Sequence, residues 1–270
     1  MSAGWLRSRL SDDERLVVVD CRFVLGSPGA GARLWEEGHI PGARFLDVDR
    51  DLSGPVGDGS RGRHPLPSAV AFAEAATRAG ISAGRSVVAY DEAGEGGAAR
   101  LWWLLRHFGH SDVAVLDGGL RGWRSGGGSL DDAVPEPGPG GEPFVARERG
   151  GDVASAEELA GPLRVDLVDA RAPERFRGEV EPIDPVAGHI PGARNVPFAS
   201  VAPGGAFVDR DMLRQRLSAG DGRELVAYCG SGITASTLVL AAAVAGLPAR
   251  LYPGSWSEWC ARGLPVARGD

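Results

Sequence analysis

Residues 224–245 read ELVAYCGSGITASTLVLAAAVA, and this stretch predicts a strand, a short glycine-spaced loop and a helix. The apolar run 224–228 is typical of a buried strand, and the uniformly apolar run 235–245 predicts a helix buried on all sides. In such a turn, successive backbone N–H groups point into one concavity, and the helix N-terminus adds a partial positive charge there. The stretch therefore predicts an anion-binding cup on an α/β fold.

Cys229 stands at the carboxyl end of the expected strand, where open α/β sheets place their ligand crevices. A free cysteine is more often a small core residue, but a core cysteine would lie within the strand or the helix. The thiolate is the nucleophilic form of the side chain, and an anion cup stabilises it. We therefore predict that Cys229 is a nucleophile, with Gly230 and Gly232 providing the backbone freedom that the loop needs.

The sequence also contains two copies of one pattern. The run GHIPGAR at residues 38–44 recurs without change at 188–194. Further landmarks keep the same order in both copies, because residues 16–22 answer to 166–171, 86–91 to 224–229 and 117–123 to 253–259. Landmarks repeated in one order indicate a duplicated domain.

Each copy alternates expected strands with expected helices, which is typical of an α/β domain with a mainly parallel sheet flanked by helices. We expect a first domain over residues 1–125, a glycine- and proline-rich linker over 126–143 and a second domain over 144–270. Within the second domain, Ser155-Ala-Glu-Glu158 is a capping-box pattern and predicts the start of a helix.

The two copies differ at the position of the cysteine. The first copy has Asp91 there, followed by a longer, acidic segment over residues 92–99. That copy has no nucleophile, so we expect an inactive domain that forms one wall of the crevice around Cys229. We expect it to bury Trp102, Trp103 and Leu104.

Composition excludes several classes of protein. The hydrophobic fraction of 43% and the charged fraction of 24% are ordinary for a globular chain. No apolar run reaches the length of a membrane span and no signal-peptide pattern opens the chain, so we expect a cytoplasmic protein without a membrane partner. A net charge of −7 without a basic run argues against nucleic acid. Three widely spaced cysteines without paired Cys/His spacing indicate no disulfide framework and no metal site.

Together, the doubled HIPGA turn, the loop from Cys229 to Thr234 and the tryptophan turns at Trp123 and Trp259 resemble the tandem-rhodanese sulfurtransferases. The resemblance covers nearly the whole chain, from about Trp5 to Val266. It implies two rhodanese-like domains and no cofactor. It also implies that Cys229 takes a sulfur atom as a persulfide from a small anionic donor, releasing pyruvate or sulfite. A thiophilic acceptor such as cyanide, a small thiol or thioredoxin then removes the sulfur, in two displacements with ping-pong kinetics.

The loop also bears on the sulfur donor. A Cys-Gly-Ser-Gly-(Val/Ile)-Thr loop is similar to that of the 3-mercaptopyruvate branch, whereas the thiosulfate branch carries basic residues after its cysteine. Gly230 and Ser231 are neutral, which favours 3-mercaptopyruvate. Thiosulfate as the main donor stays open, and we expect a monomer or a weak dimer.

The resemblance further implies residues that bind the donor. Arg175 matches the family's substrate-binding arginine, and its planar fork suits a carboxylate or thiosulfonate; from spacing alone it would be an exposed arginine paired with Glu174 or Glu179. A second arginine often precedes the second HIPGA turn in the mercaptopyruvate branch, but this chain has Glu181-Pro-Ile-Asp184-Pro there. This departure either argues against 3-mercaptopyruvate as the donor or moves the role to Arg177. The loop's N–H groups are expected to hold the persulfide, and they belong to Gly230, Ser231, Gly232, Ile233 and Thr234.

Proton transfer is a further expectation that the resemblance raises. It implies a relay from Ser231 through His39, the histidine of the first HIPGA turn, to an aspartate that residues 26–33 do not supply. The alternative is that His39 and its counterpart His189 only fix their own turns by hydrogen bonds. Cys21 is expected to be a packing residue, and Cys260 either a redox partner of Cys229 or inert.

Two other functions need to be weighed. Cysteine phosphatases and arsenate reductases use a similar cup with a Cys-x5-Arg motif, but the sixth residue after Cys229 is Ala235. The sequence therefore lacks the motif of a cysteine phosphatase or an arsenate reductase. A non-catalytic sulfur-carrier module, which hands its persulfide only to a partner protein, is the remaining alternative. The aspartate–arginine pairs that recur in both copies are interpreted as structural, and they are Asp20 with Arg22 and Asp169 with Arg171.

Overall fold

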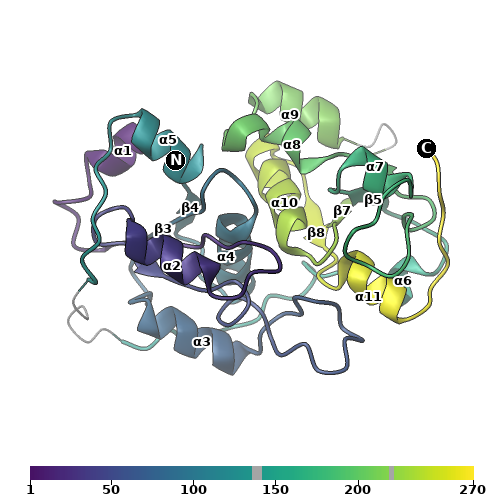
Figure 1. Ribbon diagram of the computed structural model, residues 1–270, viewed down its shortest axis with the longest axis horizontal. Coiled ribbons are helices and arrows are strands. Elements are labelled where there is room, and N and C mark those ends of the chain that lie inside the picture. The colour runs from purple at the N-terminus through teal and green to yellow at the C-terminus, as the bar shows by residue number, and fades with distance from the viewer. Residues whose placement is uncertain (136–141, 219–221) are drawn as a thin grey trace. The chain divides into compact units, whose positions relative to one another are not determined.

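The computed structural model describes residues 1–135, 142–218 and 222–270, which Figure 1 draws in colour. The chain forms two compact units. Unit 1 comprises residues 1–54, 67–149 and 204–206, and unit 2 comprises residues 55–66, 150–203 and 207–270. Residues 55–66, assigned by sequence to the first domain, thus group with unit 2. Of the expected linker, residues 136–141 lie outside the described part of the chain.

Unit 1 is an α/β unit with one parallel sheet in the strand order β2-β1-β3-β4. Its central strands are rich in valine, and β-branched side chains suit strands that are buried on both faces. Its elements are α1 (Ala3–Arg7), β1 (Leu16–Asp20), α2 (Ala30–Glu37), β2 (Arg44–Phe45), α3 (Ala69–Arg78), β3 (Ser86–Tyr90), α4 (Gly97–His107), β4 (Val113–Val115) and α5 (Gly119–Ser125).

Unit 2 repeats this arrangement with a parallel sheet in the order β6-β5-β7-β8. Helix α10 packs against β7 and β8 (Figure 1). The elements are α6 (Ala156–Leu159), β5 (Asp166–Asp169), α7 (Pro173–Phe176), β6 (Arg194–Asn195), α8 (Phe198–Val201), α9 (Arg210–Leu217), β7 (Leu225–Tyr228), α10 (Ile233–Ala245), β8 (Ala249–Leu251) and α11 (Ser255–Ala261). A 3-10 turn spans Pro203–Gly205. The expected α/β fold with two similar parallel sheets is confirmed.

The duplication extends to the hydrogen bonds of each core. The hydroxyl of Tyr90 accepts from the N–H of Ile40 at 3.2 Å, and that of Tyr228 accepts from the N–H of Ile190 at 3.2 Å. These bonds fix each HIPGA turn to the strand that precedes the loop. The two aspartate–arginine pairs are buried and joined at 2.7 and 2.6 Å, so their structural interpretation is confirmed.

Helix α10 begins two residues earlier than the apolar run suggested. Gly232 precedes it in a left-handed conformation, and Gly246 ends it in the same region. Most of the helix is buried, but Val244 is 44% exposed, so the expectation of burial on all sides is wrong for the last turn. The start of α6 matches the capping-box prediction, since the Ser155 hydroxyl accepts from the N–H of Glu158 at 3.2 Å.

In unit 1 the loop after β3 is filled by the chain's own carboxylate. Asp91 is buried and accepts hydrogen bonds from the N–H groups of Gly94, Gly96 and Ala98 at 2.6, 3.0 and 3.2 Å. The counterpart of the anion cup in this unit thus binds an internal anion. Trp102, Trp103 and Leu104 are buried, as expected.

The Asp91 carboxylate predicts a pH-dependent contribution to stability. Burial, with a smaller contribution from the charge of Glu95, raises the pKa of Asp91 from 3.8 to about 6. The folded protein then binds a proton that the unfolded chain releases, so this contribution is complete below pH 3.8 and is lost as the pH rises through 6. The expected loss is roughly 3 kcal/mol. Urea unfolding of the wild type and of Asp91→Asn across this range measures it: the variant should lack this slope, and equal slopes would contradict the assignment.

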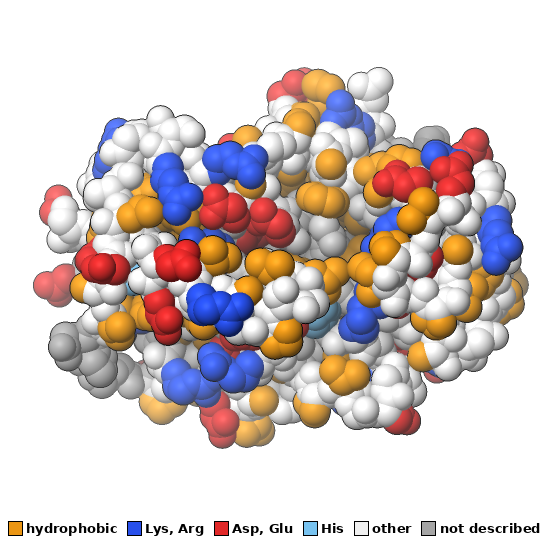
Figure 2. Space-filling view, viewed as in Figure 1, with side chains coloured by type: hydrophobic (Ala, Val, Ile, Leu, Met, Phe, Trp, Pro, Cys, Tyr) orange, Lys and Arg blue, Asp and Glu red, His pale blue; other side chains and the backbone are white. Residues whose placement is uncertain are grey.

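Basic and acidic side chains are interspersed on the face drawn in Figure 2, where the blue residues are all arginine. None of the described helices has the length and apolarity that a membrane span requires.

Candidate active site

Cys229 follows β7 directly, and the start of α11 holds its backbone on both sides. Its N–H donates to the Ser255 hydroxyl at 3.1 Å, and its carbonyl accepts from the N–H of Trp256 at 3.0 Å. The side chain is only 2% exposed, and its sulfur accepts from the N–H of Gly232 at 3.1 Å. The sulfur therefore already sits within hydrogen-bonding distance of the loop's backbone.

Glycine at position 232 is a requirement of this geometry. Gly232 has φ of +83°, and a Cβ there would overlap the carbonyl oxygen of Pro253. The glycine turns the chain from the loop into α10, whose first N–H groups have no acceptor within the helix. Ile233 and Thr234, both expected to hold the persulfide, are the first two residues of that helix.

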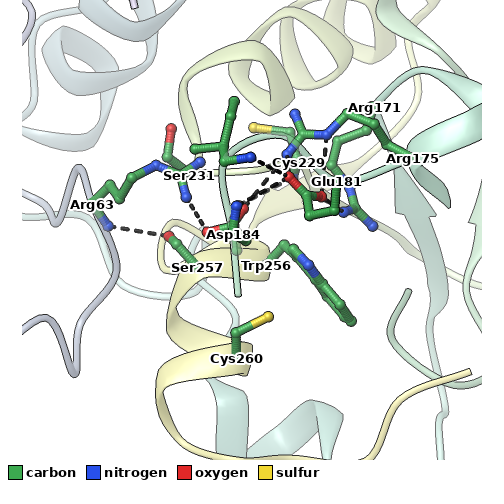
Figure 3. Close-up of polar contacts among 12 residues, drawn as sticks. Arg63, Arg171, Arg175, Glu181, Asp184, Cys229, Ser231, Trp256, Ser257 and Cys260 are labelled. Atoms are coloured by element: carbon green, nitrogen blue, oxygen red, sulfur yellow. Dashed lines mark hydrogen bonds and ion pairs between the residues drawn. The ribbon is translucent and has the colours of Figure 1, made fainter. Parts of the chain in front are cut away.

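Arg175, from α7, lies beside the loop. A Cβ added at Gly230 would lie 3.7 Å from both terminal nitrogens of its guanidinium. The ion pairs of Arg175 differ from the pair with Glu174 or Glu179 that spacing alone favoured. Instead, Arg175 binds Glu181 through two bonds of 2.6 and 3.2 Å and lies 3.5 Å from Asp184 (Figure 3). Residues 181–184, which lack the second arginine of the mercaptopyruvate branch, thus supply two carboxylates that bind Arg175.

These carboxylates titrate differently. Burial raises the pKa of Asp184, although the nearby charge of Arg63 opposes the shift. Burial also acts against ionisation of Glu181, but the hydrogen bond and charge of Arg175, together with backbone hydrogen bonds from Asp184 and Ile183, outweigh burial and lower the pKa of Glu181. Glu181 accepts as well from the N–H groups of Ile183 and Asp184 at 3.1 Å, which fixes the turn. Asp184 is therefore the carboxylate of this turn that gains a proton more readily.

A second guanidinium comes from a segment that sequence reasoning missed. Arg63 belongs to residues 55–66 of unit 2, and its guanidinium forms an ion pair with Asp184. A Cβ at Gly230 would lie 2.9 Å from its Nη2 atom. No sequence signal indicated this residue, since 121 positions separate it from Asp184 and no motif surrounds it.

His64, the next residue, is also new. Its Nδ1 atom lies 2.7 Å from the hydroxyl oxygen of Ser231, and both side chains are buried. His39 belongs to unit 1, where its Nδ1 atom lies 2.8 Å from the Trp35 carbonyl oxygen and its ring stacks on that of Trp35. Ser231 thus has a histidine neighbour that the sequence did not indicate. The hydrogen bond of His39 agrees with the alternative that this histidine fixes its own turn, as His189 does.

The remaining candidates are placed as follows. Arg177 pairs with Glu179 at 2.7 Å on the surface. Burial, and the charge of Asp184, raise the pKa of Cys260 to about 11, which keeps it a thiol at neutral pH. Burial also raises the pKa of Cys21 far above its ordinary value, as suits a packing residue. All three cysteines are free.

Comparison with known proteins places this geometry in a family. The family model for the rhodanese-like domain matches residues 2–126 and 152–262. A Pseudomonas aeruginosa protein named "Probable 3-mercaptopyruvate sulfurtransferase" is 47% identical, over 100% of this chain and 98% of its own length. A Mycobacterium tuberculosis protein named "Putative thiosulfate sulfurtransferase SseB" is 41% identical, over 100% and 96%.

A solved structure is also similar to this chain over nearly its whole length. The crystal structure of SseA from Escherichia coli, a 3-mercaptopyruvate sulfotransferase, superposes with a TM-score of 0.80 at 32% identity, over 95% of this chain and 98% of that one. Each unit's parallel sheet, the cysteine loop and the two family matches lead to one conclusion. The chain belongs to the family of rhodanese-like sulfurtransferases, as a tandem of two such domains.

Proposed function

We propose that this protein transfers a sulfur atom from 3-mercaptopyruvate to a thiophilic acceptor through a persulfide on Cys229. The observation that carries the proposal is the position of the Cys229 sulfur, which accepts from the N–H of Gly232 beside the guanidinium groups of Arg63 and Arg175. A nucleophilic sulfur, a backbone anion cup and cationic forks are what the transfer of sulfur from an anionic donor requires.

In the first half-reaction the Cys229 thiolate attacks the sulfur of 3-mercaptopyruvate. An S–S bond forms, the C–S bond breaks, and its electron pair passes to carbon as the enolate of pyruvate. The donor's own thiol supplies the proton that the enolate needs. This proton ends on the pyruvate carbon, and the transferred sulfur stays on the enzyme as a persulfide anion. Ser231 and His64 are placed to carry that proton, since they are hydrogen-bonded at 2.7 Å beside the cysteine.

In the second half-reaction the acceptor attacks the outer sulfur of the persulfide. The S–S bond breaks, the acceptor keeps the sulfur, and the Cys229 thiolate is restored. Cyanide, a small thiol and thioredoxin are acceptors with the required affinity for sulfur. The N–H groups of the loop stabilise the anion in each resting form, so one cup serves both half-reactions.

The choice of donor is the part of the proposal that a direct comparison of substrates tests. Gly230 and Ser231 are neutral and Ser231 has a proton-transfer partner, and both features favour 3-mercaptopyruvate, whose enolate needs a proton. Thiosulfate releases sulfite and needs no such step. The relatives include one named for each donor.

We therefore expect 3-mercaptopyruvate to be preferred by about tenfold or more in kcat/KM, or ~1.4 kcal/mol in transition-state stabilisation. Steady-state thiocyanate formation from each donor, with cyanide as acceptor, measures the preference. A preference for thiosulfate would assign the protein to the other branch. Loading of Cys229 with sulfur but no turnover of either donor would instead favour the carrier class.

A further inference from the structure

Ser255 has a backbone conformation that glycine adopts freely and other residues rarely adopt. Its φ is +54°, and within residues 1–135, 142–218 and 222–270 no other residue except glycine has a positive φ. In this region the Cβ atom crowds the following carbonyl oxygen, so a serine is strained. The side chain of Ser255 is also fully buried. Strain that a fold retains at a buried polar residue points to a role for its side chain.

The Ser255 hydroxyl joins the ends of two neighbouring strands. It accepts from the N–H of Cys229 at 3.1 Å and donates to the carbonyl oxygen of Tyr252 at 2.9 Å. Cys229 directly follows β7, and Tyr252 directly follows β8, which pairs with β7. The hydroxyl thus satisfies a buried backbone donor and a buried backbone acceptor at the carboxyl ends of both strands.

Unit 1 provides an internal comparison. The matching segments 117–123 and 253–259 align Gly119 with Ser255, and Gly119 has φ of +58°. In both units the next residue of this turn donates its N–H to the carbonyl oxygen of the residue that follows the central strand, at 2.9 Å in unit 1 and 3.0 Å in unit 2. A glycine therefore forms the same turn without strain. The unit that contains the nucleophile is the one that has a hydroxyl there.

The bond to Ser255 fixes the backbone of the nucleophile. The carbonyl oxygen of Cys229 accepts from the N–H of Trp256, which Figure 3 labels, so residue 229 is held on both sides. Its side chain then extends into the loop, where the sulfur accepts from the N–H of Gly232 at 3.1 Å. Without the hydroxyl one of the two backbone bonds is lost, and a reacting atom displaced by about 1 Å can lose roughly 10²-fold in rate.

We propose that Ser255 is a positioning residue for the nucleophile. Its hydroxyl fixes the N–H of Cys229, so that the sulfur stays within reach of the loop's N–H groups in both half-reactions. This inference rests on the proposed sulfurtransferase function and adds to it a residue that is buried away from donor and acceptor. The strained serine is retained because the glycine of unit 1 has no hydroxyl to offer.

Two substitutions separate the hydroxyl from the strain. Ser255→Gly removes both, whereas Ser255→Ala removes the hydroxyl and keeps a Cβ atom at positive φ. We expect each variant to lower kcat/KM about tenfold or more for the donor and for cyanide alike, because the same sulfur reacts in both half-reactions. The Tm should be lower in Ser255→Ala than in Ser255→Gly, since alanine retains the strain. Steady-state thiocyanate formation and thermal unfolding provide the measurements.

Ser155→Ala is the matched control, because the Ser155 hydroxyl also accepts from a backbone N–H in unit 2, at the start of α6. It should lower the Tm and leave both kinetic values within about twofold. Wild-type kinetics in Ser255→Gly, with a loss only in Ser255→Ala, would show that activity follows strain and would overturn the inference. A loss confined to the donor value would also overturn it, because it would show a role in donor binding.

Alkylation of Cys229 separates the inference from the proposed function, because it needs no sulfur donor. Iodoacetamide is reacted at neutral pH with the wild type and with Ser255→Gly, and peptide mapping follows residue 229. We expect the variant to react about fivefold more slowly, because its thiolate loses the fixed N–H of Gly232. Loosened structure alone would expose the thiol and speed the reaction. An equal or faster rate would therefore overturn the role of Ser255, whatever the sulfurtransferase activity.

Discussion

Replacing Cys229 with serine should lower turnover of both donors by at least about 10⁴-fold. A serine hydroxyl is far less acidic and less nucleophilic than a thiol. The substitution only exchanges sulfur for oxygen in a nearly buried side chain. The hydrogen bonds to Ser255 and Trp256 that hold residue 229 belong to its backbone and are kept. The fold should therefore persist while the chemistry is lost.

Thiocyanate formation from 3-mercaptopyruvate and from thiosulfate measures this loss, and circular dichroism checks the fold. Cys260→Ser is the matched control. Cys260 stays protonated at neutral pH because its pKa is raised to about 11, so its removal should leave turnover within about twofold. A Cys229→Ser enzyme that keeps a tenth of the activity would show that the sulfur passes through another group.

The proton relay predicts a loss that depends on the donor. Ser231→Ala should lower kcat with 3-mercaptopyruvate by about 10²-fold, because the pyruvate enolate then loses its positioned proton source. With thiosulfate the same variant should stay within about threefold, since sulfite leaves without a proton. The thiosulfate reaction is thus an internal control for the shape of the loop.

His64→Gln should reproduce the selective loss, and the double variant should be no worse than either single one, because the two side chains act as one unit. Steady-state kinetics of the three variants on both donors provides the measurement. Equal losses with the two donors would mean that Ser231 shapes the cup. A selective loss in His39→Gln but not in His64→Gln would return the relay to the histidine first predicted.

The sequence predicted the features that depend on local pattern. The repeated HIPGA turns revealed the duplication, and the two parallel sheets follow from it. The strand, glycine loop and apolar helix around Cys229 could be predicted because each depends on neighbouring residues. The family resemblance indicated Arg175, which lies near Gly230, but its partners Glu181 and Asp184 could not be predicted, since spacing favoured Glu174 or Glu179.

What the sequence did not reveal depends on contacts across long stretches of chain. His64 meets Ser231 across 167 positions, and residues 55–66 have no regular structure whose pattern could have marked them. The HIPGA histidine was the more visible candidate because it is repeated. Its repetition, however, signals a structural hydrogen bond, and that bond recurs at His189.

The most direct test of the account is the intact mass of the protein after incubation with donor and without acceptor. We predict that the wild type gains the mass of one sulfur atom, that peptide mapping places it on Cys229, and that cyanide removes it with an equal amount of thiocyanate. Absence of the added mass with both donors, or its location on Cys21 or Cys260, would contradict the account.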